Sequence, residues 1–353
     1  MKIAVLLSGG VDSSVALQLL KNEGKHEITA FYLKIWLEDE MSFLGNCPWE
    51  EDLEFVRAIC EKLDVPLKII PLQEQYHQRV VSYVVDELKK GRTPSPDILC
   101  NERVKFGAFF DFIDESYEKV ASGHYAQVEQ IGDKFVLKRA PDPVKDQTYF
   151  LSSLSQKQLR RALFPIGHLQ KNEVRDLAKE FDLPTKTRKD SQGICFLGKI
   201  KYNDFVKFNL GEKKGDIIEI DTGKKWGEHN GFWFHTIGQR QGLGLHGGPW
   251  YVVKKDIHKN IVYISHKENR QNNARSSFIT STPHWITGDA PEETMGLQCK
   301  LRHGPDLIGC CFITMDNGDL AVQLTQKDPG VAPGQSVIFY KDTVCLGRAI
   351  ITE

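Results

Sequence analysis

The sequence lacks the long apolar segments that would place the protein in a membrane. No window approaches 18 consecutive uncharged apolar residues, so we expect no transmembrane helix. The apolar residues 1–7 run directly into Ser8 and Gly9 without a cleavage-type site. This start predicts a buried strand rather than a signal peptide, and we expect a cytoplasmic protein.

Paired cysteines are also missing. The 353 residues contain eight cysteines, and none of them form a Cys-x-x-Cys spacing. A zinc ribbon or finger is therefore not expected, and a chain of this length needs no disulfide framework. We expect most of the cysteines, Cys47 among them, to be small buried residues, and we expect no dedicated metal site.

An excess of charge of either sign is absent as well. The chain has 46 Lys and Arg against 47 Asp and Glu, a net charge of −1. The whole protein therefore gives no electrostatic argument for nucleic acid, although a local basic face would still serve. Basic groups crowd between positions 138 and 201, but each group taken alone is more typical of a solvated surface.

The patterns that are present divide the chain into three parts. Up to about residue 202, strand and helix signals alternate, which predicts a parallel sheet covered on both faces. Helices are expected at residues 76–90 and 101–117 within it. Farther on, glycine becomes dense and short hairpins replace the helices. We predict an α/β catalytic domain (1–202), a small linking domain (203–272) and a C-terminal antiparallel β-barrel (273–353).

The first predicted strand leads into Ser-Gly-Gly-Val-Asp-Ser-Ser at residues 8–14, and a helix follows. The glycines allow a sharp turn, while backbone N–H groups, serine hydroxyls and the helix N-terminus favour an anion. A capped turn explains only part of this pattern, and the lysine of a Walker A loop is missing. A Gly-x-Gly-x-x-Gly pattern at residues 242–247 precedes a strand rather than a helix, so it predicts no nicotinamide site.

Two cysteines have chemically suggestive neighbours. Cys100 follows Asp97 by three residues at an expected helix start, where the helix dipole would lower the pKa of the thiol. A proline-rich loop with a capping Asp97 and a buried cysteine fits that spacing equally well. Cys195 follows basic residues that favour a thiolate or persulfide, although taken alone it fits an ordinary buried cysteine better.

Together, several ordered segments resemble the tRNA-specific 2-thiouridylase family (MnmA type) of the PP-loop ATP pyrophosphatase superfamily. These segments are residues 7–14, 91–106, 121–126, 145–151, 190–196, 235–244 and 333–346. The resemblance covers essentially the whole chain. It implies a Rossmann-like, adenine nucleotide alpha hydrolase-like catalytic domain. It also implies an enzyme that adenylates wobble uridine 34 of tRNA and replaces its C2 oxygen with sulfur, releasing AMP and pyrophosphate.

The resemblance assigns roles to individual residues. Cys100 would be the nucleophile, Cys195 the persulfide carrier and transient disulfide partner of Cys100, and Asp97 the general acid/base. The target base would face Ser95, Pro96 and Asp97. ATP would be bound by Leu7, Ser8, Gly9, Gly10, Val11, Asp12, Ser13, Ser14, Leu33 and Gly123. The tRNA would be contacted by His124, Lys145, Asp146, Gln147, Arg302, His303 and Gln335.

The resemblance also implies the cofactors and partners. These are ATP with Mg²⁺, tRNAs for Lys, Glu and Gln, and a cysteine desulfurase or sulfur-relay protein that supplies a persulfide. An iron–sulfur cluster is not indicated, and we expect a monomer. The chain departs from the family at Ser95, where asparagine is usual, and at residues 38–51. Residues 300–304 only approximate the family's basic strand.

Two other functions share part of the pattern. A PP-loop ligase for a small carboxylate or amide would need residues 8–14 but neither Cys100 nor Cys195. A non-catalytic nucleotide sensor would share the early α/β pattern but has no use for Asp97 beside a thiol. Pyrophosphate release that depends on unmodified tRNA would separate the three functions.

Overall fold

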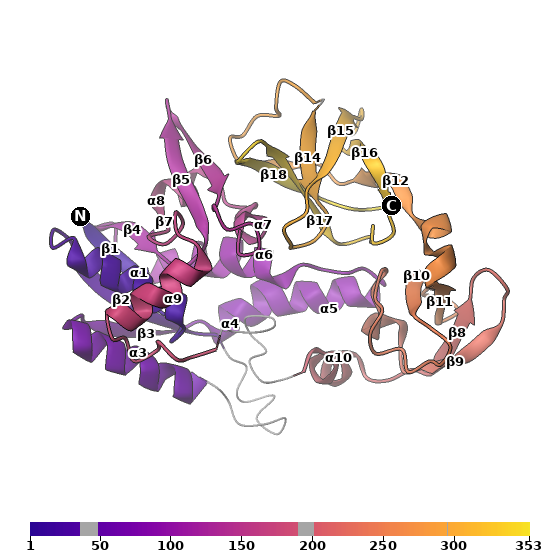
Figure 1. Cartoon of the computed structure of the whole chain (residues 1–353), viewed down its shortest axis with the longest axis horizontal. Helices are drawn as coiled ribbons and strands as arrows, with labels where there is room; N and C mark the ends of the chain where they lie inside the picture. Colours follow the sequence, from indigo (N-terminus) through magenta and orange to yellow (C-terminus); the bar gives the residue numbers. More distant parts are fainter. Residues whose placement is uncertain (36–48, 190–200, 295) are drawn as a thin grey trace.

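The computed structural model describes residues 1–35, 49–189, 201–294 and 296–353. In the described part of the chain, three β-sheets form the framework, and the large antiparallel sheet lies between the N-terminal parallel sheet and the small sheet of the middle part (Figure 1). Within the described ranges, no helix has both the length and the apolar character that a membrane span requires.

The first sheet is the parallel sheet that the alternating patterns predict. Its strands run in the order β3 (Leu67–Pro71), β2 (Glu27–Lys34), β1 (Lys2–Leu6), β4 (Tyr117–Ala121) and β7 (Ala162–Leu163), and all neighbours are parallel. Ile3 and Val5 of β1 belong to one apolar cluster, whereas Ala4 and Leu6 belong to another. Because successive side chains of a strand point to opposite faces, β1 is buried on both sides.

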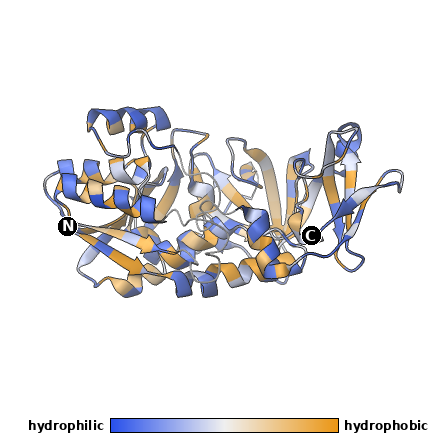
Figure 2. Ribbon diagram, turned by 90° about the horizontal axis from the view of Figure 1, so that it is seen from below, coloured by the Kyte–Doolittle hydropathy of each residue, from blue (hydrophilic) through white to orange (hydrophobic). Residues whose placement is uncertain are grey.

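Helices cover both faces of this sheet. On the side of Ile3, α1 (Val11–Asn22) and α3 (Trp49–Leu63) contribute to the apolar cluster, and on the side of Ala4 a helical run including α5 (Ser82–Lys89) does so. The strands are mainly hydrophobic, whereas the helices carry hydrophilic residues as well (Figure 2). The other described α-helices are α4 (Gln73–Tyr76), α6 (Pro96–Cys100), α7 (Thr148–Leu151), α8 (Gln156–Arg161), α9 (Lys171–Glu180) and α10 (Tyr202–Leu210).

The single helix predicted over residues 101–117 is divided into two short helical segments and ends at Phe112. A π-helical turn at Asn101–Lys105 continues α6, and a separate 3₁₀ segment spans Ala108–Phe112. The break falls at Gly107, where a Cβ atom would lie 2.5 Å from the carbonyl oxygen four residues earlier. The apolar residues that suggested one long helix lie on these two short segments instead, and several of them are buried there.

The middle part forms a small sheet of its own. The strand order is β10 (Trp250–Asp256), β11 (Ile261–His266), β8 (Gly215–Glu219) and β9 (Lys225–His229). β10 and β11 pair in antiparallel fashion and form one of the short hairpins that the sequence predicts for this part of the chain. Ile217, Val252 and Val262 form its buried centre together with aromatic residues.

The C-terminal sheet is antiparallel, as predicted, but it is not built from the C-terminal part alone. Its order is β12 (Arg275–Thr280), β16 (Leu320–Asp328), β15 (Ile308–Thr314), β14 (Leu297–Lys300), β17 (Ser336–Lys341), β18 (Val344–Ile350), β6 (Lys134–Arg139) and β5 (Ala126–Ile131), with β13 (His284–Trp285) beside β18. Cys345 of β18 pairs with Leu137 of β6. A hairpin from the first 202 residues therefore continues the last sheet and ties the two regions together.

Candidate active site and tRNA-facing segments

Residues 8–14 run from the end of β1 into the first turn of α1, and the serine hydroxyls of this loop tighten it. The Ser8 N–H donates to Ser13 Oγ at 3.3 Å, and Ser14 Oγ donates to the Gly10 carbonyl oxygen at 2.7 Å. Gly9 adopts φ +73°, and a Cβ there would lie 2.6 Å from the backbone oxygen of Asp52. Gly10 is the N-cap of α1, and no side chain of the described residues caps that helix end. The N-terminus of α1 is thus suited to receive an anion.

Gly123, predicted from the resemblance to contact the nucleotide, lies directly against this loop. A Cβ at Gly123 would be 2.6 Å from the Ser13 nitrogen, so only glycine allows this approach. Gly123 follows β4, and half-buried Leu33 lies near the end of β2; these strands flank β1 in the sheet. Ligands of parallel α/β sheets bind beyond the carboxyl ends of the strands, which is where these predicted residues lie.

Asp12 in the loop has two partners that sequence reasoning missed. The Tyr125 hydroxyl donates to Asp12 Oδ1 at 2.9 Å, and Lys171 Nζ lies 2.6 Å from the same oxygen. Arg188 supports the loop from another side, donating to the Gly9 carbonyl oxygen at 2.7 Å. Lys171 is 159 positions from Asp12, and its local sequence predicts only the start of a helix.

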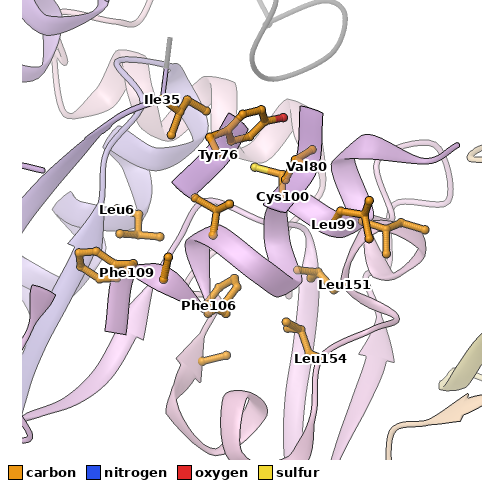
Figure 3. Packing of buried hydrophobic residues seen from close by; sticks show 14 of the residues in the cluster. Leu6, Ile35, Tyr76, Val80, Leu99, Cys100, Phe106, Phe109, Leu151 and Leu154 are labelled. Atoms are coloured by element: carbon orange, nitrogen blue, oxygen red, sulfur yellow. The ribbon is translucent and has the colours of Figure 1, made fainter. Parts of the chain in front are cut away.

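The Asp97–Cys100 segment forms the short helix α6, with Asp97 in the first turn. Cys100 is the last residue of α6 and lies outside its first turn, the part of a helix where the dipole acts most strongly. The Cys100 side chain is fully buried in a cluster with Tyr76, Val80 and Leu99 (Figure 3). Cys195 and Cys47 lie outside the described residues.

Tyr149 joins three of the segments that carry the family resemblance. Its hydroxyl donates to the Ser336 carbonyl oxygen at 3.3 Å and makes a polar contact with the side chain of Ser95. Burial raises the pKa of Tyr149 to about 12, which keeps the phenol protonated as a donor. Nearby, the Thr93 N–H donates to the Pro333 carbonyl oxygen at 2.8 Å. The segment before Asp97 is therefore held between the catalytic region and the C-terminal sheet.

Two residues predicted to contact tRNA are buried. His124 is 9% exposed, and its Nδ1 lies 2.7 Å from Ser122 Oγ. Burial, helped by the charge of Lys105, lowers the pKa of His124 well below its ordinary value, so the imidazole is neutral. Asp146 is fully buried, and Lys300 Nζ donates a hydrogen bond to Asp146 Oδ2 at 2.9 Å.

The buried Asp146 carboxylate is ionised because of its surroundings. Burial alone would raise its pKa, but the charge of Lys300 and hydrogen bonds from Lys300, Arg139 and Thr148 lower it overall. Arg139 Nε lies 2.9 Å from Asp146 Oδ2, the oxygen that Lys300 also contacts. Lys300 belongs to β14, so this pair fastens the predicted tRNA segment to the C-terminal sheet. Neither Asp146 nor His124 presents its side chain to solvent here.

The other predicted tRNA contacts are accessible to different degrees. Lys145, Gln147 and Gln335 are half-buried, and Arg302 and His303 are exposed. The Arg302 guanidinium makes a two-pronged contact with Asp328 at 2.9 and 3.0 Å, while its side chain stays 57% exposed. The His303 ring stacks on that of Phe150, with centroids 4.7 Å apart. Among the described side chains, no three His, Cys, Asp or Glu group as metal ligands would.

A phosphate-type loop after the central strand of a parallel sheet, joined to two β regions, defines an α/β nucleotide-binding enzyme of the PP-loop class. Models of the tRNA methyl transferase HUP domain, the tRNA methyl transferase PRC-barrel domain and the aminomethyltransferase beta-barrel domain match residues 1–199, 203–266 and 275–351. The chain belongs to the MnmA family of tRNA-specific 2-thiouridylases, as its full-length relatives establish.

Three relatives named tRNA-specific 2-thiouridylase match this chain over its whole length. The tRNA-specific 2-thiouridylase MnmA of Parabacteroides distasonis is 46% identical over 100% of this chain and 99% of its own length. MnmA 1 of Bacteroides thetaiotaomicron is 45% identical over 100% of both chains. MnmA of Porphyromonas gingivalis is 42% identical over 100% of this chain and 99% of its own.

Proposed function

We propose that this chain is a tRNA-uridine 2-sulfurtransferase that activates wobble uridine 34 with ATP and then thiolates it from a protein-bound persulfide. The observation that carries the proposal is the meeting of three segments at Tyr149. Its hydrogen bond to the Ser336 carbonyl and its polar contact with Ser95 bring the Asp97–Cys100 helix, the 145–151 segment and the C-terminal sheet together. A base held by the β regions would thus lie beside α6, the helix that carries Asp97 and Cys100 next to the nucleotide sheet.

Adenylation is the first step of the proposed reaction. The uridine C2 oxygen attacks the α-phosphate of ATP, a bond to that phosphorus forms, and the bond to the β-phosphate breaks, giving pyrophosphate and an adenylated base. The loop at residues 8–14 and the N-terminus of α1 stabilise the charge on the phosphates. Asp12 and the serine hydroxyls are oxygen donors of the kind that accept the Mg²⁺ accompanying ATP, which neutralises phosphate charge.

Sulfur transfer is the second step. A persulfide on Cys195 supplies its outer sulfur to C2 as AMP leaves, and the Cys100 thiolate attacks the inner sulfur of Cys195. The resulting Cys100–Cys195 disulfide accounts for the two electrons that reduce the outer sulfur, and a two-electron thiol reductant restores the enzyme. Asp97, in the first turn of α6, exchanges protons with the base.

The tRNA is held by accessible residues and supported by buried ones. Lys145, Gln147, Arg302, His303 and Gln335 contact the RNA in this proposal. Gln335 is half-buried, and its side-chain oxygen has no hydrogen-bond partner within the described structure. Asp146 and His124 act by holding the contact segments in place. We further propose tRNAs for Lys, Glu and Gln as substrates, a cysteine desulfurase or relay protein as sulfur donor, and a monomeric enzyme.

Pyrophosphate release tests the proposal against its alternatives. We expect the protein to release pyrophosphate from ATP only when unmodified tRNA is present, because the attacking oxygen belongs to the base. The matched control is the same tRNA already carrying 2-thiouridine, which lacks that oxygen and should give no release. Release without tRNA, driven by a small carboxylate or amide, would establish the ligase alternative instead.

A further inference from the structure

The PP-loop contains no lysine, but the fold brings one to it. Lys171 Nζ lies 2.6 Å from Asp12 Oδ1, and the Lys171 side chain is 15% exposed against 32% for Asp12. The Tyr125 hydroxyl meets the same oxygen at 2.9 Å. The cation therefore lies at the partly open edge of the loop rather than in the apolar interior.

Lys171 is held in this position from its own helix. Its N–H donates to Asp142 Oδ2 at 3.1 Å, and Gln170 and Glu173 form a capping box around the start of α9. Val174 of α9 belongs to the same buried cluster as Val11 and Val15 of α1. Because α9 packs on α1, the lysine stem starts from a fixed point beside the loop.

A nucleoside triphosphate brings several negative charges to a loop that already contains the Asp12 carboxylate. Arg188 also contacts the loop, but its guanidinium already donates to the Gly9 carbonyl oxygen at 2.7 Å and to Asp52 at 2.7 Å. Lys171 offers three donors on a flexible stem, so its ammonium can contact a phosphate oxygen next to Asp12. Walker A loops carry such a lysine in their own sequence, whereas this loop receives one from a helix 159 positions away.

We propose that Lys171 is a phosphate-binding catalytic residue of the ATP site, which leaves Asp12 for a phosphate oxygen when ATP binds. As the bond to the β-phosphate breaks, negative charge moves onto the pyrophosphate, and the Lys171 ammonium donates a hydrogen bond to it without transferring its proton. The catalytic part rests on the proposed adenylation reaction. The binding part does not, because it concerns ATP and pyrophosphate alone.

Binding of metal-free inorganic pyrophosphate and of ATP to the full chain, measured by calorimetry without tRNA, tests the binding part. Lys171→Met should weaken pyrophosphate binding by roughly 10- to 100-fold, the value of a charge-assisted hydrogen bond. Lys171→Arg should retain most of the affinity, since the charge remains. Lys62→Met is the matched control, because Lys62, in the last turn of α3, pairs with Asp182 at 3.5 Å rather than with a residue of the loop. The pyrophosphate affinity of this variant should equal that of the wild type.

Asp12→Asn should change the pyrophosphate affinity in the opposite direction from Lys171→Met. If Asp12 competes with phosphate for Lys171, this variant should bind metal-free pyrophosphate more tightly than the wild type, even though it loses catalysis. A structural role for the pair predicts no such gain. Lys171→Met that melts earlier but binds pyrophosphate with wild-type affinity would overturn the proposal. Should Lys171→Met fail to fold, unchanged affinity in Asp12→Asn would overturn it instead.

Turnover separates this inference from the proposed function. With tRNA, Lys171→Met should slow pyrophosphate release by about 100-fold or more, as loss of one electrostatic stabiliser does. Wild-type protein that binds pyrophosphate through Lys171 but releases none with tRNA would refute the adenylation reaction and leave the phosphate site standing. Wild-type release matched by Lys171→Met would refute the role of Lys171 alone.

Discussion

Two lysine–aspartate pairs of similar length occupy opposite environments in this molecule. Lys171 meets Asp12 at 2.6 Å beside the phosphate loop, where both side chains reach solvent. Lys300 meets Asp146 at 2.9 Å, and both are fully buried between the 145–151 segment and the C-terminal sheet. A partly exposed pair can exchange partners cheaply, whereas a buried pair cannot be opened without leaving a charge unpaired. The first pair is therefore suited to ligand binding and the second to fastening the domains.

Removing one lysine from each pair should break this comparison most clearly. Lys300→Met leaves Asp146 buried with Arg139 as its remaining cation, and we expect a loss of about 3 kcal/mol in the free energy of unfolding. Lys171→Met should lose about 1 kcal/mol or less, because solvent screens its partner. Urea unfolding of both variants measures the difference. Equal losses would show that burial does not distinguish the pairs.

Two glycines allow a test of how tightly the C-terminal sheet packs against the segment before Asp97. Gly334 and Gly288 have nearly the same positive φ, +91° and +89°. A Cβ at Gly334 would lie 2.7 Å from the Thr93 nitrogen, whereas a Cβ at Gly288 would meet nothing within 4 Å. Both alanine variants share the backbone cost, so their difference isolates the clash.

We expect Gly334→Ala to be less stable than Gly288→Ala by about 1–3 kcal/mol, the usual range for overpacking. Because Thr93 leads into the Asp97–Cys100 helix, Gly334→Ala should also reduce thiolation more than Gly288→Ala does. Thermal melting and 2-thiouridine content of the product tRNA provide the two readouts. Identical behaviour of the two variants would mean that the junction does not position the catalytic segment.

The smallest expected effect concerns acid. The pKa of buried His124 is held below its ordinary value of about 6.5, so the unfolded chain binds a proton that the folded chain refuses. Stability should therefore fall as pH decreases below about 6.5, by at most about 1.4 kcal/mol per pH unit for this group. The Asp146 pKa is lowered, so its contribution persists above about pH 3.9 and disappears only as pH falls through the folded value.

His124→Gln removes the titrating group and keeps a polar side chain beside Ser122. The slope of unfolding free energy between pH 6.5 and 5 should be shallower in this variant than in the wild type, as measured by urea unfolding at each pH. His246→Gln, an exposed histidine of the middle region, is the control and should keep the wild-type slope. An unchanged slope in His124→Gln would mean that His124 is not the neutral buried group described above.

The sequence predicts those features whose residues lie close together along the chain. The loop at residues 8–14, the parallel sheet and the C-terminal hairpins each follow from local composition and periodicity. Lys171 and Tyr125 could not be predicted as partners of Asp12, because contacts across 159 and 113 positions depend on how the helices pack. The pairing of β6 with β18 was missed for the same reason.

The sequence also did not show which of the predicted site residues are buried. The motif around Cys100 predicts a helix and a thiol, but not that the thiol is its last residue and fully buried. The family resemblance groups Lys145, Asp146 and Gln147 as tRNA contacts, whereas only packing separates fully buried Asp146 from its half-buried neighbours. Whether a polar side chain faces RNA or a partner inside the protein is a property of the assembled fold.

The location of the transferred sulfur tests the central claim most directly. After exposure to a cysteine desulfurase and cysteine, followed by alkylation without reductant, peptide mass spectrometry should find one added sulfur on the Cys195 peptide in the wild type and in Cys100→Ser. Cys195→Ser should carry none, and neither variant should form 2-thiouridine. Added sulfur on Cys100 in both the wild type and Cys195→Ser would reverse the two roles. Normal thiolation by both variants would contradict the persulfide mechanism itself.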